Sequence, residues 1–349
     1  MIPKHMRGVQ LVAHGGPDVL VHKTDIPTPR PGPMDVLIRV AAAGVNNTDI
    51  NTRVGWYSKG DNDADDASWA GTALQFPRIQ GIDVCGHIVA VGTGVDTARI
   101  GERVLVEPCL RESGGKPLDP VWFLGSECDG GFAEYTRVAA RHAYAIDTTL
   151  TDTELASFPC SYSTSENMLT RAQVSAGDRV LITGASGGVG SAAVQLACAR
   201  GAKVIAVTSP SKADALRDLG AAQILTRTDT PSEILGPNSI DVVIDLVAGP
   251  GWPDLLDVLR PGGRYAVAGA VAGPIVELDV RTLYLKDLSF FGCTALDPQV
   301  FANLVRLIET GAIKPLVAQT FDLKEISMAQ EVFQEKGYVG KIVLNVTAP

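Results

Sequence analysis

Short apolar runs alternate with helical segments through the middle of the chain. Residues 179–183 have the Val, Leu, Ile and Thr composition of a buried strand, and residues 201–209 form a helix stop and a second buried strand. A glycine-rich turn and a run of small and apolar residues at helical spacing lie between them. Strand, glycine turn, helix and strand in this order predict the βαβ unit that places a pyrophosphate at a helix N-terminus.

The same alternation continues from residue 151 to about residue 296. The further elements that we expect are helices at 211–220, 252–260 and 298–310 and strands at 241–247, 263–269 and 283–293. Residues 1–150 differ, because short alternating stretches such as 36–41 and 86–92 are separated by Pro- and Gly-rich turns. The strand at 340–346 is expected to return to this first part. We therefore predict an α/β protein of two domains, a β-rich one formed by 1–150 and 297–349 and a doubly wound parallel-sheet one formed by 151–296.

The glycine-rich turn has the pattern A-x-G-G-x-G, with Ala185 at the place of the usual first glycine. Gly187 lets the backbone approach a diphosphate, and Gly190 lets the helix pack closely on the strand. Exposed backbone N–H groups and the positive end of the helix favour phosphate. The predicted cofactor-binding residues of this turn are Ala185, Ser186, Gly187, Gly188, Val189 and Gly190.

The end of the second buried strand predicts which dinucleotide binds. An NAD site usually has Asp or Glu there to accept hydrogen bonds from the ribose 2′-OH. This chain has Thr208, Ser209 and Lys212 instead. Hydroxyls and an ammonium suit a 2′-phosphate, so we expect NADPH rather than NADH, with a solvated Lys212 as the alternative.

The composition excludes several classes of function. A net charge of −9 and a pI near 5.1 argue against a nucleic-acid-binding face, which needs a basic patch. No apolar run approaches the roughly 20 residues that span a bilayer, and residues 1–6 lack the apolar core of a signal peptide. None of the six cysteines forms a C-x-x-C pair, so free thiols in the cytoplasm are expected.

Several motifs in a fixed order resemble the medium-chain dehydrogenase/reductase superfamily, and within it the zinc-free quinone oxidoreductase branch. They are residues 15–20, 44–50, 53–57, 81–86, 130–135, 185–190 and 340–344, which cover nearly the whole chain. The resemblance implies a GroES-like catalytic domain, a Rossmann domain and a cleft between them.

The positions of the zinc ligands in that superfamily are altered here. Zinc-dependent members read G-[VI]-C and G-H-E at the first two ligands, where this chain has Asn46 and Gly81-Ile82-Asp83. Cys160 falls at the third, so one thiolate stands where three ligands are needed. Cys85 and His87 share a strand face, but a core cysteine beside a satisfied histidine is favoured over a metal pair. We therefore expect no zinc.

The resemblance also implies the roles of individual residues. Asn46 would hold the nicotinamide ribose or a substrate oxygen, and Tyr57 would donate a hydrogen bond or a proton. Arg53 would line the substrate side, with a salt bridge to the acidic segment 58–68 as an equal alternative. For Tyr57 the alternative is a loop aromatic packed under that segment, which reads as a solvated insertion rather than a metal-binding loop. Residues implied near the nicotinamide are Thr164, Gly269, Ala270 and Val271, with Arg227 a weaker assignment at the adenine end.

The function that these observations favour is NADPH-dependent hydride transfer, without zinc, to quinones or to the C=C bond of α,β-unsaturated carbonyl compounds. A metal-free alcohol or carbonyl dehydrogenase of the same fold and a non-catalytic NADPH-binding sensor or structural protein remain open. The substrate is expected to be a small molecule. The resemblance further implies a homodimer through an edge strand at 283–291.

Overall fold

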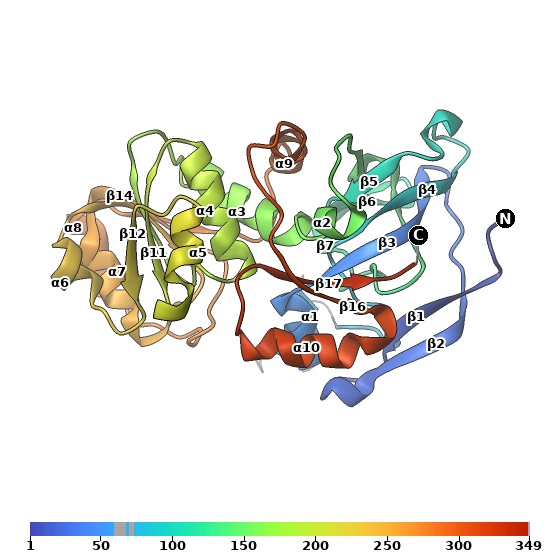
Figure 1. Cartoon of the computed structure of the whole chain (residues 1–349), viewed down its shortest axis with the longest axis horizontal. Coiled ribbons are helices and arrows are strands. Elements are labelled where there is room, and N and C mark those ends of the chain that lie inside the picture. Colours follow the sequence, from blue (N-terminus) through green and yellow to red (C-terminus); the bar gives the residue numbers. More distant parts are fainter. Residues whose placement is uncertain (59–67, 70–72, 348–349) are drawn as a thin grey trace. The chain divides into compact units, whose positions relative to one another are not determined.

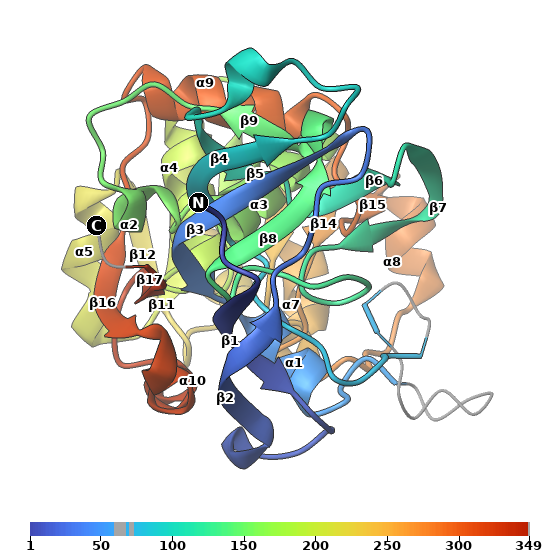
Figure 2. The ribbon, with the colours of Figure 1, turned by 90° about the vertical axis from the view of Figure 1, so that its right-hand side faces the viewer.

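The computed structural model describes residues 1–58, 68–69 and 73–347 (Figures 1 and 2). It divides into two compact units, each considered by itself. The first comprises Met1–Cys160, Pro315–Gly337 and Lys341–Pro349, and the second comprises Ser161–Lys314 and Tyr338–Gly340. Residues 151–160, expected in the second domain, belong to the first unit, and residues 297–314, expected in the first domain, belong to the second. The acidic segment 58–68 lies almost wholly outside the described residues.

A six-stranded parallel sheet forms the centre of the second unit, with the strand order β12-β11-β10-β13-β14-β15. Its strands are β10 (Arg179–Ile182), β11 (Lys203–Thr208), β12 (Gln223–Thr226), β13 (Ile240–Asp245), β14 (Leu259–Val267) and β15 (Ser289–Gly292). Its helices are α3 (Pro159–Arg171), α4 (Gly188–Ala199), α5 (Ala213–Asp218), α6 (Pro231–Leu235), α7 (Trp252–Val258), α8 (Val280–Leu285) and α9 (Val300–Glu309). Figure 1 shows helices on both sides of this sheet. This is the doubly wound Rossmann arrangement predicted from the alternating pattern.

Burial of both faces explains the near-continuous apolar composition of these strands. Leu181, Ile205 and Val243 from three neighbouring strands belong to one buried cluster, which the rings of Trp252 and Tyr265 complete. The two rings meet edge to face with their centroids 5.9 Å apart. The β-branched and Leu residues that predicted buried strands are therefore the residues that pack the helices against the sheet.

The predicted strand at 283–293 is wrong in its first half. Residues Val280–Leu285 form helix α8, and only Ser289–Gly292 form a strand. Asp279 caps the helix, since its side chain accepts a hydrogen bond from the backbone N–H of Arg281 at 2.9 Å. Leu283 packs on the core while Tyr284 and Leu285 are 59% and 69% exposed, so the apolar residues do not alternate as a strand requires. The part that is a strand, β15, lies at the sheet edge as expected.

The first unit is built around a sheet with the strand order β16-β17-β3-β4-β5-β9, in which β8 also pairs with β3. Its strands are β3 (Asp35–Val45), β4 (Cys85–Val91), β5 (Arg103–Val106), β8 (Tyr135–Ala139), β9 (Ala143–Ala145), β16 (Val317–Asp322) and β17 (Lys341–Asn345). Two hairpin-like pairs accompany it, namely β1 (His5–Leu11) with β2 (Leu20–Pro27) and β6 (Cys109–Ser113) with β7 (Lys116–Phe123). In Figure 2, β3, β4, β5 and β8 run side by side. Strand β17 pairs antiparallel with β3, which confirms the predicted return of the C-terminal strand.

Among the described residues, three α-helices lie wholly in the first unit. They are α1 (Asn47–Arg53), α2 (Asp152–Leu155) and α10 (Ile326–Glu335). The shorter 3₁₀ turns of the chain are η1 (Pro17–Val19), η2 (Thr97–Arg99), η3 (Ala140–His142), η4 (Pro210–Lys212), η5 (Gly249–Gly251) and η6 (Leu323–Glu325). None of the described helices is long and apolar enough to cross a membrane. All six cysteines are free, as predicted.

Candidate functional site

A buried polar cluster lies where β3 ends and α1 begins in the first unit. Asp83 is its centre: Oδ2 accepts a hydrogen bond from Asn46 Nδ2 at 2.8 Å and lies 2.8 Å from Lys341 Nζ. The other carboxylate oxygen, Oδ1, accepts a hydrogen bond from the backbone N–H of Cys160 at 2.5 Å. Lys341 Nζ also donates to Asn46 Oδ1. These four residues are called the Asp83 cluster below.

The Asp83 carboxylate fits because glycine, which has no side chain, stands next to it. A Cβ at Gly44 would collide with Asp83 Oδ2 and would come within 2.7 Å of the Ala156 carbonyl oxygen. Gly81 has a φ of +103°, a conformation that L side chains rarely adopt. Glycine is therefore required at 44 by the close approach of Asp83, and at 81 by the backbone conformation.

Asp49 closes the N-terminus of α1 next to the cluster. Its Oδ2 accepts a hydrogen bond from the backbone N–H of Asn46 at 2.8 Å, as the third helical residue does in a capping box. The Gly81 N–H donates to Oδ1 at 3.3 Å. Burial raises the pKa of Asp49 to about 7, and the nearby Asp83 charge raises it as well, whereas the two N–H donors and Lys341 lower it. Asp49 therefore changes charge near neutral pH.

Tyr57 is held from two directions. Its hydroxyl donates to Thr48 Oγ1 at 3.1 Å, and its ring stacks on Trp69 with a centroid distance of 5.9 Å and an interplanar angle of 3°. Trp69 in turn stacks on Phe123 at 4.1 Å. Burial raises the pKa of Tyr57 to about 12, so its hydroxyl remains a neutral hydrogen-bond donor across the physiological range. The side chain is thus a fixed neutral donor above the start of α1.

Arg53 is 2% exposed, and its side chain forms hydrogen bonds within the first unit. Its Nε donates to Gln330 Oε1 at 2.8 Å, and one terminal nitrogen donates to the Gly15 carbonyl oxygen at 2.5 Å. Burial lowers its pKa, while the charge of Asp18 raises it. These contacts join α1 to α10 and to the loop before β2.

In the second unit the glycine-rich turn connects β10 to α4. Gly184 has a φ of +58°, and Gly187 is the N-cap of α4. A Cβ at Gly190 would collide with the Gly184 carbonyl oxygen and lie 2.6 Å from Ala185 Cα. Close packing of α4 on the turn therefore requires glycine at 190. The backbone N–H of Ala185 donates to the Val207 carbonyl oxygen at 3.2 Å and ties the turn to β11.

A second buried carboxylate, Asp245, lies at the end of β13. It accepts hydrogen bonds from Thr183 Oγ1 at 2.5 Å and from the Tyr265 hydroxyl at 2.6 Å. The backbone N–H groups of Val247 and Ala248 donate to it at 2.9 and 3.2 Å. Asp245 with these four donors is called the Asp245 cluster. It holds together the residue before the glycine-rich turn and the turn after β13.

The predicted loop Gly269, Ala270 and Val271 follows β14 beside that turn. The Ala272 N–H donates to the Val247 carbonyl oxygen at 2.9 Å, and a Cβ at Gly269 would lie 2.8 Å from the Leu246 carbonyl oxygen. Val271 is 68% exposed. Thr164 is half-buried on α3. The Asp245 cluster thus supports the turn on which the predicted loop Gly269 to Val271 packs.

Thr208, Ser209 and Lys212 lie together where β11 ends. Thr208 is buried, and its Oγ1 has no hydrogen-bond partner among the described residues. The Ser209 and Ser211 hydroxyl oxygens are 3.4 Å apart. Burial lowers the pKa of Lys212, and the positive charge of Arg227 lowers it further. Two cations and hydroxyls therefore gather at the strand end where a carboxylate would select NADH.

Sequence reasoning missed Asp83, Lys341 and Asp245 as site residues. Each is a single charge within an otherwise apolar run, and buried charges are almost always paired. That signal predicts partners for Asp83 and Lys341, but it does not identify them, because Asn46 and Lys341 are 295 residues apart. Thr48 and Trp69, which fix Tyr57, had no sequence signal.

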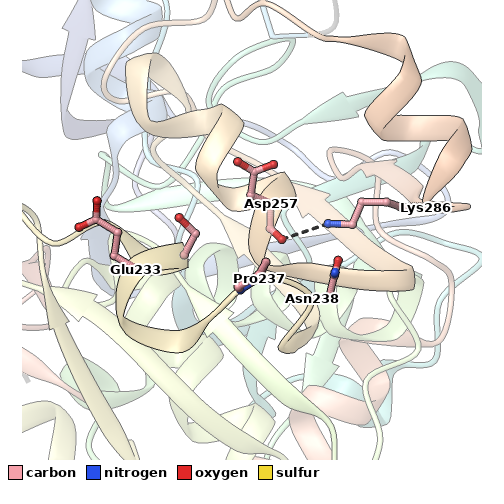
Figure 3. A pocket seen from close by; sticks show the side chains of 6 residues that line it. Glu233, Pro237, Asn238, Asp257 and Lys286 are labelled. Carbon is pink, nitrogen blue, oxygen red and sulfur yellow. Dashed lines mark hydrogen bonds between the residues drawn. The ribbon is translucent and has the colours of Figure 1, made fainter.

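A surface pocket of about 440 Å³ occurs elsewhere on the second unit (Figure 3). It is lined by Ser232, Glu233, Pro237, Asn238, Asp257 and Lys286. The Lys286 ammonium donates to the carbonyl oxygens of Leu256 and Asp257 at 2.7 and 3.0 Å, so it closes the end of α7. None of the predicted site residues lines this pocket.

Comparisons with known proteins agree with this architecture. Residues 32–148 match the family model of the alcohol dehydrogenase GroES-like domain, and residues 188–310 match the model described as zinc-binding dehydrogenase. Quinone oxidoreductase of Rattus norvegicus is 30% identical over 355 residues, which cover 98% of each chain. The chain belongs to the medium-chain dehydrogenase/reductase superfamily. Its first unit is accordingly the GroES-like unit and its second the Rossmann unit.

The names of two further relatives of this dehydrogenase/reductase refer to different reactions. Acryloyl-coenzyme A reductase of Metallosphaera sedula is 30% identical over 330 residues, covering 92% of this chain and 95% of the relative. A solved structure from Sinorhizobium meliloti 1021, described as a candidate alcohol dehydrogenase, is 48% identical with a TM-score of 0.92 and covers 99% of this chain and 98% of its own. The chain is an oxidoreductase, and the names of these relatives refer to a quinone, to acryloyl-coenzyme A and to an alcohol.

Proposed function

We propose that this protein is an NADPH-dependent reductase that transfers hydride, without a metal ion, to quinones or to the C=C bond of α,β-unsaturated carbonyl compounds. Quinone and acryloyl-coenzyme A reductases among the relatives support the acceptor class. A cytoplasmic location stays a prediction.

One observation carries the metal-free part of the proposal, and it is the Asp83 cluster. Zinc takes thiolate, imidazole or carboxylate ligands, usually three from the protein in a catalytic site. At the three corresponding positions the chain has the Asn46 amide, the Ile82 side chain and Cys160, and the neighbouring Asp83 is already paired with the Lys341 ammonium. These residues do not fit a catalytic zinc site.

The acceptor class follows from that donor set. Reduction of an isolated ketone needs a Lewis acid or a proton donor at the oxygen that becomes an alkoxide. A quinone or enone spreads the incoming charge over a conjugated system, so orientation and a few hydrogen bonds suffice. Tyr57, whose pKa of about 12 keeps its O–H neutral, is the donor that we assign to an acceptor oxygen, toward which its single proton would turn from Thr48 Oγ1. Asn46 is expected to act through its place in the Asp83 cluster, where its amide already bonds Asp83 and Lys341.

The Rossmann unit fits the cofactor. Bound NADPH supplies the hydride. Ala185 to Gly190 would hold the diphosphate, Thr208, Ser209 and Lys212 the 2′-phosphate, and Thr164 and Gly269 to Val271 the nicotinamide end. The tight packing that requires Gly190 and the buried, unpartnered Thr208 Oγ1 support this fit.

Turnover by chelator-treated protein tests the proposal. NADPH consumption is measured with quinones, enals, enones and simple ketones. Turnover confined to the conjugated acceptors is expected. Equal rates with simple ketones, or activity that returns only with added zinc, would contradict it.

Lys212→Ala tests the choice of cofactor. Loss of a charge-assisted contact of roughly 1.5–3 kcal/mol should weaken NADPH binding by about 10- to 150-fold and leave NADH binding unchanged. Lys203→Ala, at an exposed lysine that begins β11, is the matched control. Equal losses for both cofactors would show that Lys212 does not bind the phosphate.

A metal-free alcohol dehydrogenase is the second candidate, because the 48% identical structure is described as a candidate alcohol dehydrogenase. Oxidation of alcohols with NADP⁺ by metal-free protein would establish it. Activity in the conjugated-acceptor panel without alcohol oxidation would exclude it.

We also propose a homodimer through β15. This edge strand leaves backbone groups unpaired, and Phe290 on it and Tyr284 and Leu285 beside it are exposed apolar residues. Sedimentation should show a dimer at micromolar concentration. A monomer alone would contradict this assignment.

A further inference from the structure

A second pocket, of about 270 Å³, lies within the GroES-like unit along β8. Every residue of that strand, from Tyr135 to Ala139, lines it. Side chains alternate between the two faces of a strand, so a pocket that touches five consecutive residues lies along the edge of the strand. Residues of β6 and β7 also line it, and β6 contacts β8 (Figure 2). We call this the β8 pocket, and none of the residues assigned above to hydride transfer lines it.

The edge of β8 that faces this pocket has no strand beside it in the described part of the chain, where β8 pairs only with β3. The Ala140 N–H donates to the Met34 carbonyl oxygen at 2.9 Å, so even-numbered residues direct their backbone groups toward β3. The backbone groups of Tyr135, Arg137 and Ala139 therefore point to the opposite edge. The main chain thus offers hydrogen-bonding groups to whatever occupies the pocket.

Two nearly fully buried polar side chains line the β8 pocket with an atom that is not hydrogen-bonded. Asp35 is 2% exposed and Thr136 is 3% exposed. Asp35 Oδ2 accepts a hydrogen bond from the Gly32 N–H at 3.0 Å and lies 3.5 Å from Arg137 Nε. Asp35 Oδ1 and Thr136 Oγ1 have no hydrogen-bond partner among the described residues. A buried polar atom without a partner destabilises the fold, so a bound donor that reached both atoms would be stabilising.

The charge of the lining favours a positively charged ligand. Four carboxylates and two guanidiniums line the pocket, namely Asp35, Glu112, Glu127 and Asp129 against Arg78 and Arg137. The formal charge of this lining is therefore −2. The Arg78 guanidinium already donates to Asp129 at 3.0 Å. The lining also includes Trp122 and Tyr135, whose aromatic faces attract cations.

The pocket also has an apolar part, to which Met6, Ile26 and Leu110 contribute. These side chains are 3%, 6% and 3% exposed. A bare inorganic cation would leave this part without a partner, whereas a cation with an apolar body would cover it. The volume lies just below the roughly 300–1,000 Å³ of pockets for drug-sized ligands, so the ligand is smaller than these.

We propose that the β8 pocket binds a small organic amine as its ammonium ion. An ammonium carries three N–H donors and no acceptor, which suits the carboxylate oxygen of Asp35 and the hydroxyl oxygen of Thr136. The apolar or aromatic body of the amine lies against the apolar and aromatic lining. This site goes beyond the proposed hydride transfer and does not depend on it.

Three probes with the same body and different charge test the proposal: phenethylamine, phenethyl alcohol and phenylacetate. None of them carries a conjugated carbonyl group that could accept hydride. Isothermal titration calorimetry should show phenethylamine bound at one site. The alcohol should bind about 10-fold more weakly or worse, because a charge-assisted hydrogen bond is lost. Phenylacetate should not bind, since its charge has the same sign as that of the lining.

Variants locate the bound amine. Asp35→Asn can still accept from the Gly32 N–H but lacks the charge, so its affinity for phenethylamine should fall about 10-fold or more. Asp25→Asn, at an exposed carboxylate on β2 that does not line the pocket, is the matched control and should bind as the wild type. Thr136→Val removes a hydroxyl without a partner in the fold, so it should remain folded and bind several-fold more weakly. This variant decides if Asp35→Asn does not fold.

Four outcomes would overturn the proposal. They are no binding of phenethylamine at millimolar concentration, equal affinities for the three probes, unchanged affinity in the pocket variants, or loss of binding in Tyr57→Phe, which would place the amine at the proposed catalytic site. None of these measurements uses turnover. A failed acceptor panel therefore leaves this inference standing, and failed amine binding leaves hydride transfer standing.

Discussion

Two fully buried carboxylates, one in each unit, are stabilised in opposite ways. Asp245 in the Rossmann unit is satisfied by neutral donors, two hydroxyls and two backbone N–H groups. Asp83 in the GroES-like unit is satisfied by an ammonium, an amide and one backbone N–H. The first arrangement shapes loops with hydrogen bonds alone, whereas the second also balances charge. A variant at Asp245 should therefore lose hydrogen bonds, and a variant at Asp83 should also leave a buried charge without a partner.

The largest effect is expected for Asp83→Asn. The variant leaves the Lys341 ammonium buried without its counter-ion, which should lower the free energy of unfolding by about 3–5 kcal/mol. Trp56, Trp69 and Trp122 are in the first unit and Trp252 is in the second, so urea unfolding followed by tryptophan fluorescence reports mainly on the first unit. Asp129→Asn, at a carboxylate that is 58% exposed and pairs with Arg78, is the control and should cost less than about 1 kcal/mol. Similar losses for the two variants would contradict the charge-balance account.

Asp49 should make the stability of the GroES-like unit depend on pH. Its pKa is about 7 in the folded state against 3.8 for an exposed carboxyl. The folded state therefore keeps a proton that the unfolded state releases, so this contribution is fully present below pH 4 and is lost as the pH rises to about 7. The total is on the order of 4 kcal/mol. Between pH 4 and pH 7 the urea midpoint of the wild type should fall relative to that of Asp49→Asn, which lacks the titrating carboxyl. Parallel pH profiles of the two proteins would contradict this role of Asp49.

Asp245→Asn should cost less, about 1–3 kcal/mol, because only hydrogen bonds to a charged acceptor are lost. The amide NH₂ would face donors on one side, so the turn after β13 and the neighbouring loop 269–271 should loosen. NADPH affinity should fall with stability. A loss as large as that of Asp83→Asn would remove the distinction between the two clusters.

Tyr57→Phe should have the smallest effect on stability, about 0.5–1.5 kcal/mol for the hydrogen bond to Thr48. Its stack on Trp69 would remain. A decrease in kcat well beyond this loss is expected if the hydroxyl donates to the acceptor. Unchanged kcat with conjugated acceptors would show that Tyr57 does not donate to the acceptor and contributes only packing.

Much of the Rossmann unit was predictable because its signals are local. The strand, turn and helix at 179–199 follow one another in sequence, and Gly190 is needed by atoms only a few residues away. Residues 283–285 were mispredicted as strand because Leu and Tyr suit a strand or a helix equally in a short run, and the capping by Asp279 favours α8. The fold family was predictable from several motifs in one order.

The candidate site was predictable only in part. Asn46 was recognised through its place in the 44–50 motif, but its partners lie in distant segments, and no local pattern links Lys341 to Asp83. The loops that fix Tyr57 carry no readable code, since Trp69 stacks on it through tertiary packing.

The position of Lys341 in β17 has a consequence for biosynthesis. Asn46 and Asp83 emerge from the ribosome long before Lys341, and the whole Rossmann unit is synthesised in between. Until β17 adds to β3, the Asp83 carboxylate has no ammonium beside it, and the sheet lacks this strand. Domains generally fold in the order in which they are made. Here synthesis of the GroES-like unit begins first and ends last. The Rossmann unit can fold before Lys341 has been synthesised and the GroES-like unit is complete.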